Sequence, residues 1–190
     1  MIIKNNNPRT EASFSFSNRL YRFIWGIIQS SLFRFSPRSF HSFRTLILKI
    51  FGAKIGKHVH VYNKAQIWSP KNLVINNYVG IADNVQIYNV EIIKISSFTT
   101  VSQGSFLCTA SHDYNSKNLQ LYAKPIHLKK NVWIGAQAFI HPGITIEEGI
   151  VVGARSVVTK NLKKKWAVYS GFPAKYLSKR KANIVNNIRK

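Results

Sequence analysis

The stretch VWIGAQAFIHPGITIEEGIVVGARSVVTK, residues 132–160, has a large aliphatic residue at every sixth position. These residues are Ile134, Ile140, Ile146, Val152 and Val158. A period of six matches neither one nor two turns of an α-helix, and an ordinary strand alternates at every second residue. A six-residue unit is typical of a solenoid in which each unit is a short strand followed by a corner. Three units complete one coil, so the stretch predicts a triangular prism.

The same period continues upstream to Ile55. Its earlier members are Ile55, Val61, Ile67, Ile75, Ile81, Ile87, Ile95, Val101, Leu107 and Leu128. A small or β-branched residue follows most members by four positions, at Val59, Ala65, Val79, Val85, Thr99, Ser105, Val132, Ala138, Ile144, Ile150 and Ser156. We expect the large aliphatic to point inward and the smaller residue to fill the space beside the corner. The fifteen units predict a mainly β protein with a parallel β-helix of about five coils.

The period is interrupted three times, each time after the third unit of a coil. Eight residues separate Ile67 from Ile75 and Ile87 from Ile95, whereas twenty-one separate Leu107 from Leu128. All three insertions should therefore leave the prism at the same edge. The third is a protruding loop, residues 108–127, and it contains His112.

Two amphipathic helices are predicted before the repeat, within residues 1–54. For the second, Ser36 is the expected N-cap, Pro37 the first helical residue and Gly52 the residue just past the end. Its predicted apolar face is Phe40, Phe43, Leu46, Ile47, Ile50 and Phe51, with Arg38, His41, Arg44 and Lys49 opposite. The apolar side of the first helix is Leu20, Phe23, Ile24, Ile27 and Ile28. Both helices could pack on the domain, or residues 18–51 could contact a membrane surface, and the two interpretations are compatible.

The chain of 190 residues has a formal net charge of +22, which favours anionic partners such as nucleic acid, anionic lipid or a polyphosphate cofactor. The single cysteine, Cys108, excludes an internal disulfide and fits a reducing compartment. The start of the sequence does not have the pattern of a signal peptide, and its most apolar early run, residues 23–33, is too short to span a bilayer. We therefore expect a cytoplasmic protein, with a peripheral contact at the inner face of the membrane.

The motifs SFLCTASHDY, residues 105–114, and VWIGA…PGITI…GARSVVTK…GFPAK resemble the hexapeptide-repeat acyltransferases of the colanic-acid biosynthesis type. The maltose and galactoside O-acetyltransferases are similar but more distant. The resemblance covers about residues 55–180 and implies a left-handed β-helix and a homotrimer with active sites between subunits. The expected division is a helical segment at 1–54, the acyltransferase domain at 55–162 and a basic extension at 163–190, whose end, residues 181–190, is either a short helix or frayed.

His112 lies in the one long excursion from a regular scaffold, where functional residues tend to collect. The resemblance implies that His112 is the catalytic base, because a neutral hydroxyl attacks a thioester poorly and an imidazole can take its proton. Asp113 is either the group that orients the imidazole or a loop residue that caps a turn. Asp83 and Glu91 are the other acids in the plausible region.

The cofactor implied by the resemblance is acetyl-CoA, without a metal. Its pantetheine arm would lie along Gly135, Ala136, Gly153 and Ala154, beside Trp133, and backbone N–H groups near Gly135 and Ala136 would stabilise the oxyanion. The same small residues could simply be what tight corners require. The resemblance extends the groove to Lys160, Pro173, Lys175 and Arg180, whose cations suit phosphates.

The expected acceptor is a sugar or lipid-linked glycan precursor of a cell-surface polysaccharide, such as exopolysaccharide, capsule or O-antigen. Candidate acceptor-binding residues are Asn84, Asn89 and Tyr114, because Ala82 stands where the galactoside enzymes have asparagine. N-acetylation of an amino sugar is an alternative, as is a non-catalytic basic solenoid that binds anionic lipid or nucleic acid. We favour no nucleic-acid partner, because the solenoid does not interleave aromatic and basic residues along one face.

Overall fold

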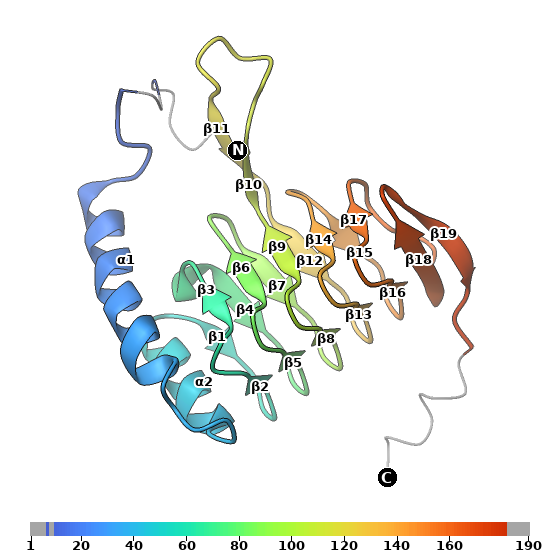
Figure 1. The fold of residues 1–190 in the computed structure, drawn as a ribbon, viewed down its shortest axis with the longest axis horizontal. Helices are drawn as coiled ribbons and strands as arrows, with labels where there is room; N and C mark the ends of the chain where they lie inside the picture. Colours follow the sequence, from blue (N-terminus) through green and yellow to red (C-terminus); the bar gives the residue numbers. More distant parts are fainter. Residues whose placement is uncertain (1–6, 8–9, 182–190) are drawn as a thin grey trace.

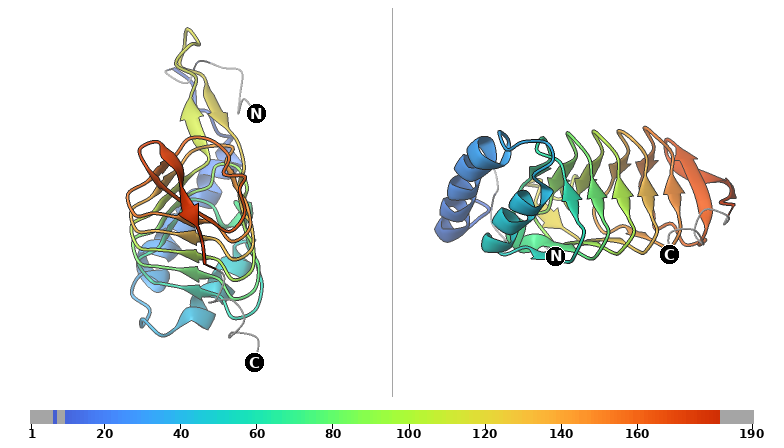
Figure 2. Two further views of the ribbon diagram at one scale, coloured as in Figure 1. Left: turned by 90° about the vertical axis from the view of Figure 1, so that its right-hand side faces the viewer. Right: turned by 90° about the horizontal axis from the view of Figure 1, so that it is seen from below.

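The computed structural model describes residue 7 and residues 10–181, and it contains a three-sided solenoid with a helical cap at one end (Figure 1). The cap consists of α1 (Phe16–Ile28), the π-helical turn η1 (Gln29–Phe33) and α2 (His41–Ile50). The solenoid follows, and the chain passes in order over its faces 1, 2 and 3 in every coil (Figure 2).

Each face of the prism is a sheet of short parallel strands stacked from coil to coil. Face 1 contains β1 (Lys54–Ile55), β4 (Leu73–Ile75), β7 (Ile93–Ile95), β12 (Ile126–Leu128) and β15 (Thr145–Ile146). Face 2 contains β2 (His60–Val61), β5 (Gly80–Ile81), β8 (Thr100–Val101), β13 (Trp133–Ile134), β16 (Val151–Val152), β18 (Ala167–Gly171) and the antiparallel β19 (Ala174–Lys179). Face 3 contains β3 (Gln66–Ile67), β6 (Gln86–Tyr88), β9 (Phe106–Cys108), β14 (Phe139–Ile140) and β17 (Val157–Val158). We name the corners by the faces they join: the 1–2, 2–3 and 3–1 corners.

The core of the prism confirms the predicted period. Of the fifteen aliphatic residues, all but Ile55 are buried, and so are the eleven small or β-branched residues that follow most of them by four positions. Successive coils pair in register, for example Ile75 with Ile95 and Ile95 with Leu128, so each coil stacks on the one before it. Because a strand of two or three residues cannot form a sheet alone, stability comes from stacking the coils.

The three insertions leave the prism at one corner, as the spacing predicts. Each falls between a face 3 strand and the next face 1 strand, which is the 3–1 corner. The first holds the 3₁₀ helix η2 (Pro70–Asn72). The third is an antiparallel hairpin of β10 (Ala110–His112) and β11 (Leu121–Ala123), which extends away from the prism (Figure 1). The sequence predicted only a loop here, because strands of three residues with a polar tip have little periodicity of their own.

Beyond β17 the coil continues. Leu162 pairs with Ile146 on face 1, and β18 pairs in parallel with β16 on face 2, so part of a sixth coil is present. The antiparallel strand β19 then closes this end of the sheet. The divisions at residues 54 and 162 remain predictions, and the tail at 182–190 lies outside the described residues.

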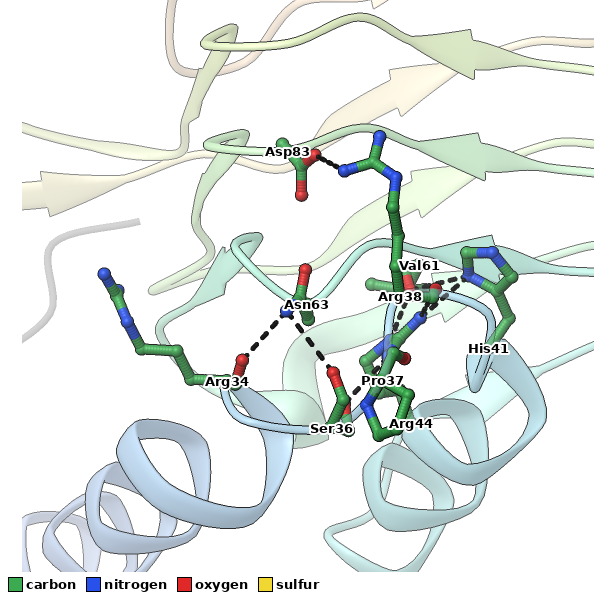
Figure 3. Close-up of polar contacts among 9 residues, drawn as sticks. All are labelled: Arg34, Ser36, Pro37, Arg38, His41, Arg44, Val61, Asn63 and Asp83. Carbon is green, nitrogen blue, oxygen red and sulfur yellow. Dashed lines mark hydrogen bonds and ion pairs between the residues drawn. The ribbon is translucent and has the colours of Figure 1, made fainter.

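The predicted start of α2 is wrong, and one residue of its predicted polar face is buried. The helix begins at His41, and Ser36 lies in the preceding turn, where its hydroxyl donates to the carbonyl of Phe33. Arg44, expected on the polar face, is fully buried, and its guanidinium donates to the carbonyl of Val61 in β2 and to Ser36 Oγ (Figure 3). It also donates to the carbonyls of Pro37 and Arg38. Because the edge of the first coil has carbonyls without a backbone partner, α2 packs with the guanidinium of Arg44 towards the prism and not with its aromatic side chains.

α1 packs on the prism through the side opposite its predicted apolar stripe. Trp25 is buried, and its indole N–H donates to the carbonyl of Ile67 in β3. Both helices therefore pack on the domain, and they cover the open edge of the first coil, which would otherwise be free to pair with another strand. None of the helices in the described part of the chain is long and apolar enough to cross a membrane.

Candidate active site

His112 ends β10, and the hairpin fixes its ring. Its Nδ1 lies 2.6 Å from the carbonyl oxygen of Leu119, on the returning side of the hairpin. A carbonyl can only accept, so Nδ1 carries the proton and Nε2 keeps a lone pair. The side chain is exposed, so this lone pair is available to a substrate hydroxyl. The geometry is that of an oriented general base.

The predicted role of Asp113 in orienting His112 is not seen in the structure. Its carboxylate accepts from the backbone N–H of Asn115, and it therefore closes a turn at the hairpin tip. The other two acids are also engaged elsewhere: Asp83 pairs with Arg38, and Glu91 accepts from the N–H of Ile92. The backbone carbonyl of Leu119 performs the orienting role instead, and no residue type in the sequence could signal a backbone group.

Cys108 does not have the surroundings of a nucleophile. Its thiol is buried at the base of the hairpin and donates to the carbonyl of Ala110. Burial raises the pKa of the thiol, which disfavours the reactive thiolate. This environment does not favour an acyl-cysteine intermediate.

Gly135 and Gly153 occupy the 2–3 corner, but packing between coils explains both. A Cβ on Gly135 would lie 2.6 Å from the backbone nitrogen of Ala154, and one on Gly153 would lie 2.6 Å from Ser170 Oγ. The N–H of Gly135 already donates to the carbonyl of Val152, so it cannot also bind an oxyanion, contrary to the prediction. The glycines therefore allow the coils to approach closely.

Ala136 and Ala154 lie at the same corner, but their backbone N–H groups differ from those of the two glycines. Ala154 is exposed and Ala136 is partly exposed. Neither backbone N–H has a hydrogen-bond acceptor among the residues that the structure describes, whereas the N–H groups of Gly135 and Gly153 are both used. Two small residues with open N–H groups on successive coils form a strip that suits an extended ligand with carbonyl groups. We call Ala136 and Ala154 the corner strip.

Trp133 stands on face 2 beside the corner strip. Its indole N–H donates to Ser102 Oγ on the preceding coil at 2.8 Å, and its side chain is half exposed. This hydrogen bond fixes the ring against the prism, so one surface remains open to a ligand. The role of Trp133 beside the acyl end of acetyl-CoA stays a prediction.

The predicted basic residues are divided among the three corners. Lys175 lies in β19 and Pro173 in the turn before it, and the N–H of Gly171, the last residue of β18, donates to Ser156 Oγ at the 2–3 corner. Lys160 follows β17 at the 3–1 corner and is exposed. Arg180 lies at the 1–2 corner, across face 2 from the strip, and its guanidinium donates to the carbonyls of Asn131 and Gly149. Arg180 thus ties coils together at the 1–2 corner, and its predicted cofactor role stays a prediction.

A trough of about 600 Å³ opens on face 2 next to the corner strip. Its lining includes Arg38, His60, Tyr62, Asp83, Asn84, Thr100 and Ser102. Arg38 comes from the linker before α2, its guanidinium stacks over the ring of Tyr62, and it pairs with Asp83 across the trough (Figure 3). No pattern in the sequence indicates that Arg38 lies here, because forty-five positions separate it from Asp83.

Of the three predicted acceptor-binding residues, only Asn84 lines the trough. Tyr114 is exposed near the tip of the hairpin. Asn89 is fully buried, and both ends of its amide bond the backbone of Ser69 on the previous coil. Asn89 therefore holds two insertions together at the 3–1 corner and is removed from the candidate site.

His112 and the corner strip do not meet within one chain. The hairpin leaves the 3–1 corner, whereas the strip and the trough lie at the 2–3 corner, so the whole of face 3 separates them. The outer surface of face 3 carries a ladder of partly exposed aromatic rings, with Tyr88 against Phe106 and Phe106 against Phe139. No group of three or more His, Cys, Asp or Glu side chains converges as a metal site within the described ranges.

Searches by sequence place this chain beside bacterial acetyltransferases. It is 38% identical over 139 residues to an Escherichia coli protein that is named as the colanic acid biosynthesis acetyltransferase WcaF. The alignment covers 73% of this chain and 76% of that protein. It is 27% identical to the galactoside O-acetyltransferase of the same species, covering 70% of this chain and 67% of the other. No family model matches the chain.

Solved structures agree with the fold. A hexapeptide-repeat acetyltransferase of Vibrio cholerae, solved with acetyl-CoA, superposes with a TM-score of 0.79 at 23% identity, covering 88% of this chain and 91% of that one. An N-acyltransferase of Bacillus cereus, AntD, solved with coenzyme A and dTDP-4-amino-4,6-dideoxyglucose, superposes with a TM-score of 0.65 at 26% identity, covering 76% and 92%. The likeness to the Vibrio cholerae enzyme shows the fold, a left-handed parallel β-helix. AntD shares this fold and is named as an N-acyltransferase.

Proposed function

The chain belongs to the hexapeptide-repeat acetyltransferases that include the colanic acid biosynthesis enzyme, and on that premise we propose that it O-acetylates a sugar. The acetyl donor is acetyl-CoA, and the acceptor is a hydroxyl of a cell-surface polysaccharide precursor. The observation that supports this best is His112, whose Nδ1 is bound to the Leu119 carbonyl and whose Nε2 is free on the protruding hairpin. Family membership decides against a non-catalytic solenoid.

The residues of this chain would act as follows. Nε2 of His112 accepts the proton of the acceptor hydroxyl as its oxygen attacks the thioester carbonyl, and the carbon–sulfur bond breaks. The same nitrogen then returns the proton to the leaving thiolate, so atoms and charges balance. The open N–H groups of Ala136 and Ala154 bind the pantetheine arm and the oxygen on which charge develops. Acetyl-CoA supplies the activated acetyl group, and no acyl-enzyme is required.

The active site requires a second copy of the chain. In a cyclic trimer, the hairpin at the 3–1 corner of one subunit would reach the corner strip at the 2–3 corner of the next. That arrangement turns face 3 towards the three-fold axis and covers its aromatic ladder. Lys160, from the subunit that supplies His112, and Lys175, from the subunit that supplies the strip, would then both face the phosphates of acetyl-CoA.

The acceptor would occupy the trough beside the strip, with Asn84 and the Arg38–Asp83 pair as its polar contacts. Such a set of hydrogen-bonding groups suits a polyhydroxylated sugar better than an apolar ligand. We further propose a cytoplasmic protein that contacts the inner face of the membrane through residues 18–51, where lipid-linked glycan precursors are accessible.

The direct test is free-thiol release from acetyl-CoA in the presence of nucleotide-linked and lipid-linked sugars. We expect His112→Ala to lower kcat by about 10²- to 10⁴-fold, the usual contribution of a general base. His58→Asn is a matched control, because His58 is exposed at the 1–2 corner with a positive φ that asparagine tolerates. Unchanged transfer by His112→Ala would refute the base assignment.

N-acetylation of an amino sugar is the second candidate, and the likeness to AntD favours it. A neutral amine attacks a thioester with the same base and the same open N–H groups. An O-acetyl product is released by mild alkali, whereas an amide survives, so product mass before and after alkali separates the two.

A further inference from the structure

The outer side of α1 carries a stripe of exposed apolar residues. Its members are Phe16, Leu20, Phe23, Ile24 and Ile27. The spacing of three and four puts them on one side of the helix, opposite the buried Trp25. Folding does not need this stripe, because Trp25 and Tyr21 make the contacts of α1 with the prism and α2. Phe23 is 66% exposed, which is unusual for a phenylalanine in a helix that is already packed.

The rest of the helical cap continues this pattern. Leu32 in η1 and Phe35 in the linker are exposed, and around α2 so are Phe40, Phe43, Leu46 and Ile50. Here too the inward positions are taken by other side chains, Arg44 and Leu48 among them. So many exposed apolar side chains in one region are typical of a surface that binds a partner.

The charge around the cap identifies the partner. Between Glu11 and Asp83 the chain has ten Lys or Arg residues and no acid. Arg19, Arg34 and Lys49 are exposed on α1, the linker and α2. Apolar side chains flanked by cations suit the headgroup region of an anionic bilayer, because the rings enter the acyl boundary and the cations stay at the phosphates. A hydrophobic protein partner would not require this excess of one charge.

The position of the cap makes the contact multivalent. Both helices lie at the end of the prism opposite β18 and β19 (Figure 2). A three-fold rotation leaves height along its axis unchanged, so the three caps of the proposed trimer lie at one level. Three weak contacts then act together, and the apparent affinity exceeds that of one cap.

We propose that α1, η1, the linker and α2 form a docking surface for membranes rich in anionic lipid. This inference deepens the membrane contact in the proposed function and names its lipid class and its inserting residues. Arg38, which lines the acceptor trough, belongs to the linker of this surface, so docking brings the trough beside the bilayer. The substrate class that this arrangement favours is a glycan on a lipid carrier.

Co-sedimentation of the full chain with vesicles tests the proposal without an acetyl-transfer step. We expect binding to vesicles of phosphatidylcholine with phosphatidylglycerol and at least tenfold weaker binding to phosphatidylcholine alone. Phe23→Ser with Ile24→Ser should weaken binding by tenfold or more, since two apolar side chains no longer enter the acyl boundary. Leu177→Ser is the control, because Leu177 is equally exposed but lies in β19 at the other end of the prism.

Two results would overturn the proposal. One is equal binding by the double variant and by Leu177→Ser. The other is that the unmodified chain does not bind vesicles and forms an assembly heavier than the proposed trimer, which the double variant does not form. A further copy of the chain would then cover the exposed apolar side chains of the cap. Circular dichroism and thermal melting of each variant establish that it is folded. If the unmodified chain binds vesicles but transfers no acetyl group, the proposed function is refuted and the docking surface is not.

Discussion

Mixed trimers offer the sharpest test of an active site shared between subunits. The perturbation is a pair of variants, each defective at a different corner of the prism. His112→Ala removes the base at the 3–1 corner. Ala154→Tyr fills the strip at the 2–3 corner, and Ala154 is exposed, so the larger side chain projects outward without entering the core. Gly153 is unsuitable, because any Cβ there would collide with Ser170.

The expected activity follows from counting sites. A site between subunits is intact only when its hairpin comes from an Ala154→Tyr chain and its strip comes from a His112→Ala chain. In an equal mixture each condition holds for half of the chains, so about one quarter of the sites are intact. A site within a single chain would have no intact copies in any mixture, because every chain carries one defect.

The assay is free-thiol release after the two variants are unfolded, mixed and refolded together, with subunit ratios measured by native mass spectrometry. Each variant alone should be inactive, and a mixture of His112→Ala with His112→Gln is the control that must stay inactive. Activity in the mixed sample no higher than that of the parents would refute the shared site, provided that mixed trimers are seen by mass.

Three further predictions concern the fold. Arg44→Met should lower the free energy of unfolding in urea by about 3–5 kcal/mol, because the buried Ser36 Oγ and the carbonyls of Val61, Pro37 and Arg38 lose a charged donor, whereas the exposed Arg38→Met should cost less than about 1 kcal/mol. Burial lowers the pKa of His41, and the nearby Arg44 adds to this, so the unfolded chain binds the proton more readily. Stability should therefore fall as the pH drops below about 6.5, and His41→Gln should reduce the slope of unfolding free energy against pH, a result that an unchanged slope would contradict. Gly135→Ala should destabilise by about 2 kcal/mol or more through contact with the next coil, while Gly26→Ala, with open space around it, should be neutral or stabilising in the same urea titration.

The N-terminal helices show where prediction from sequence fails. The sequence predicts their existence and amphipathic pattern, but not which side packs on the prism. The pattern says which residues are apolar, whereas the edge of the first coil decides which side chains it accepts. That edge presents unpaired carbonyls at Val61 and Ile67, so Arg44 and Trp25, both with N–H donors, were selected over the aromatic and aliphatic residues around them.

The sequence by itself determined the prism, its coils, the edge at which the insertions leave and the placement of His112 on the longest of them. A strict period records, residue by residue, which positions are buried by the neighbouring coil, and such contacts are local in a solenoid. Only the tertiary structure decided that Leu119 orients the imidazole, that Arg38 lines the trough, and that the base and the corner strip stand at different corners. These features depend on backbone groups and on residues that are far apart in the chain, and no periodic pattern in the sequence reports either of them.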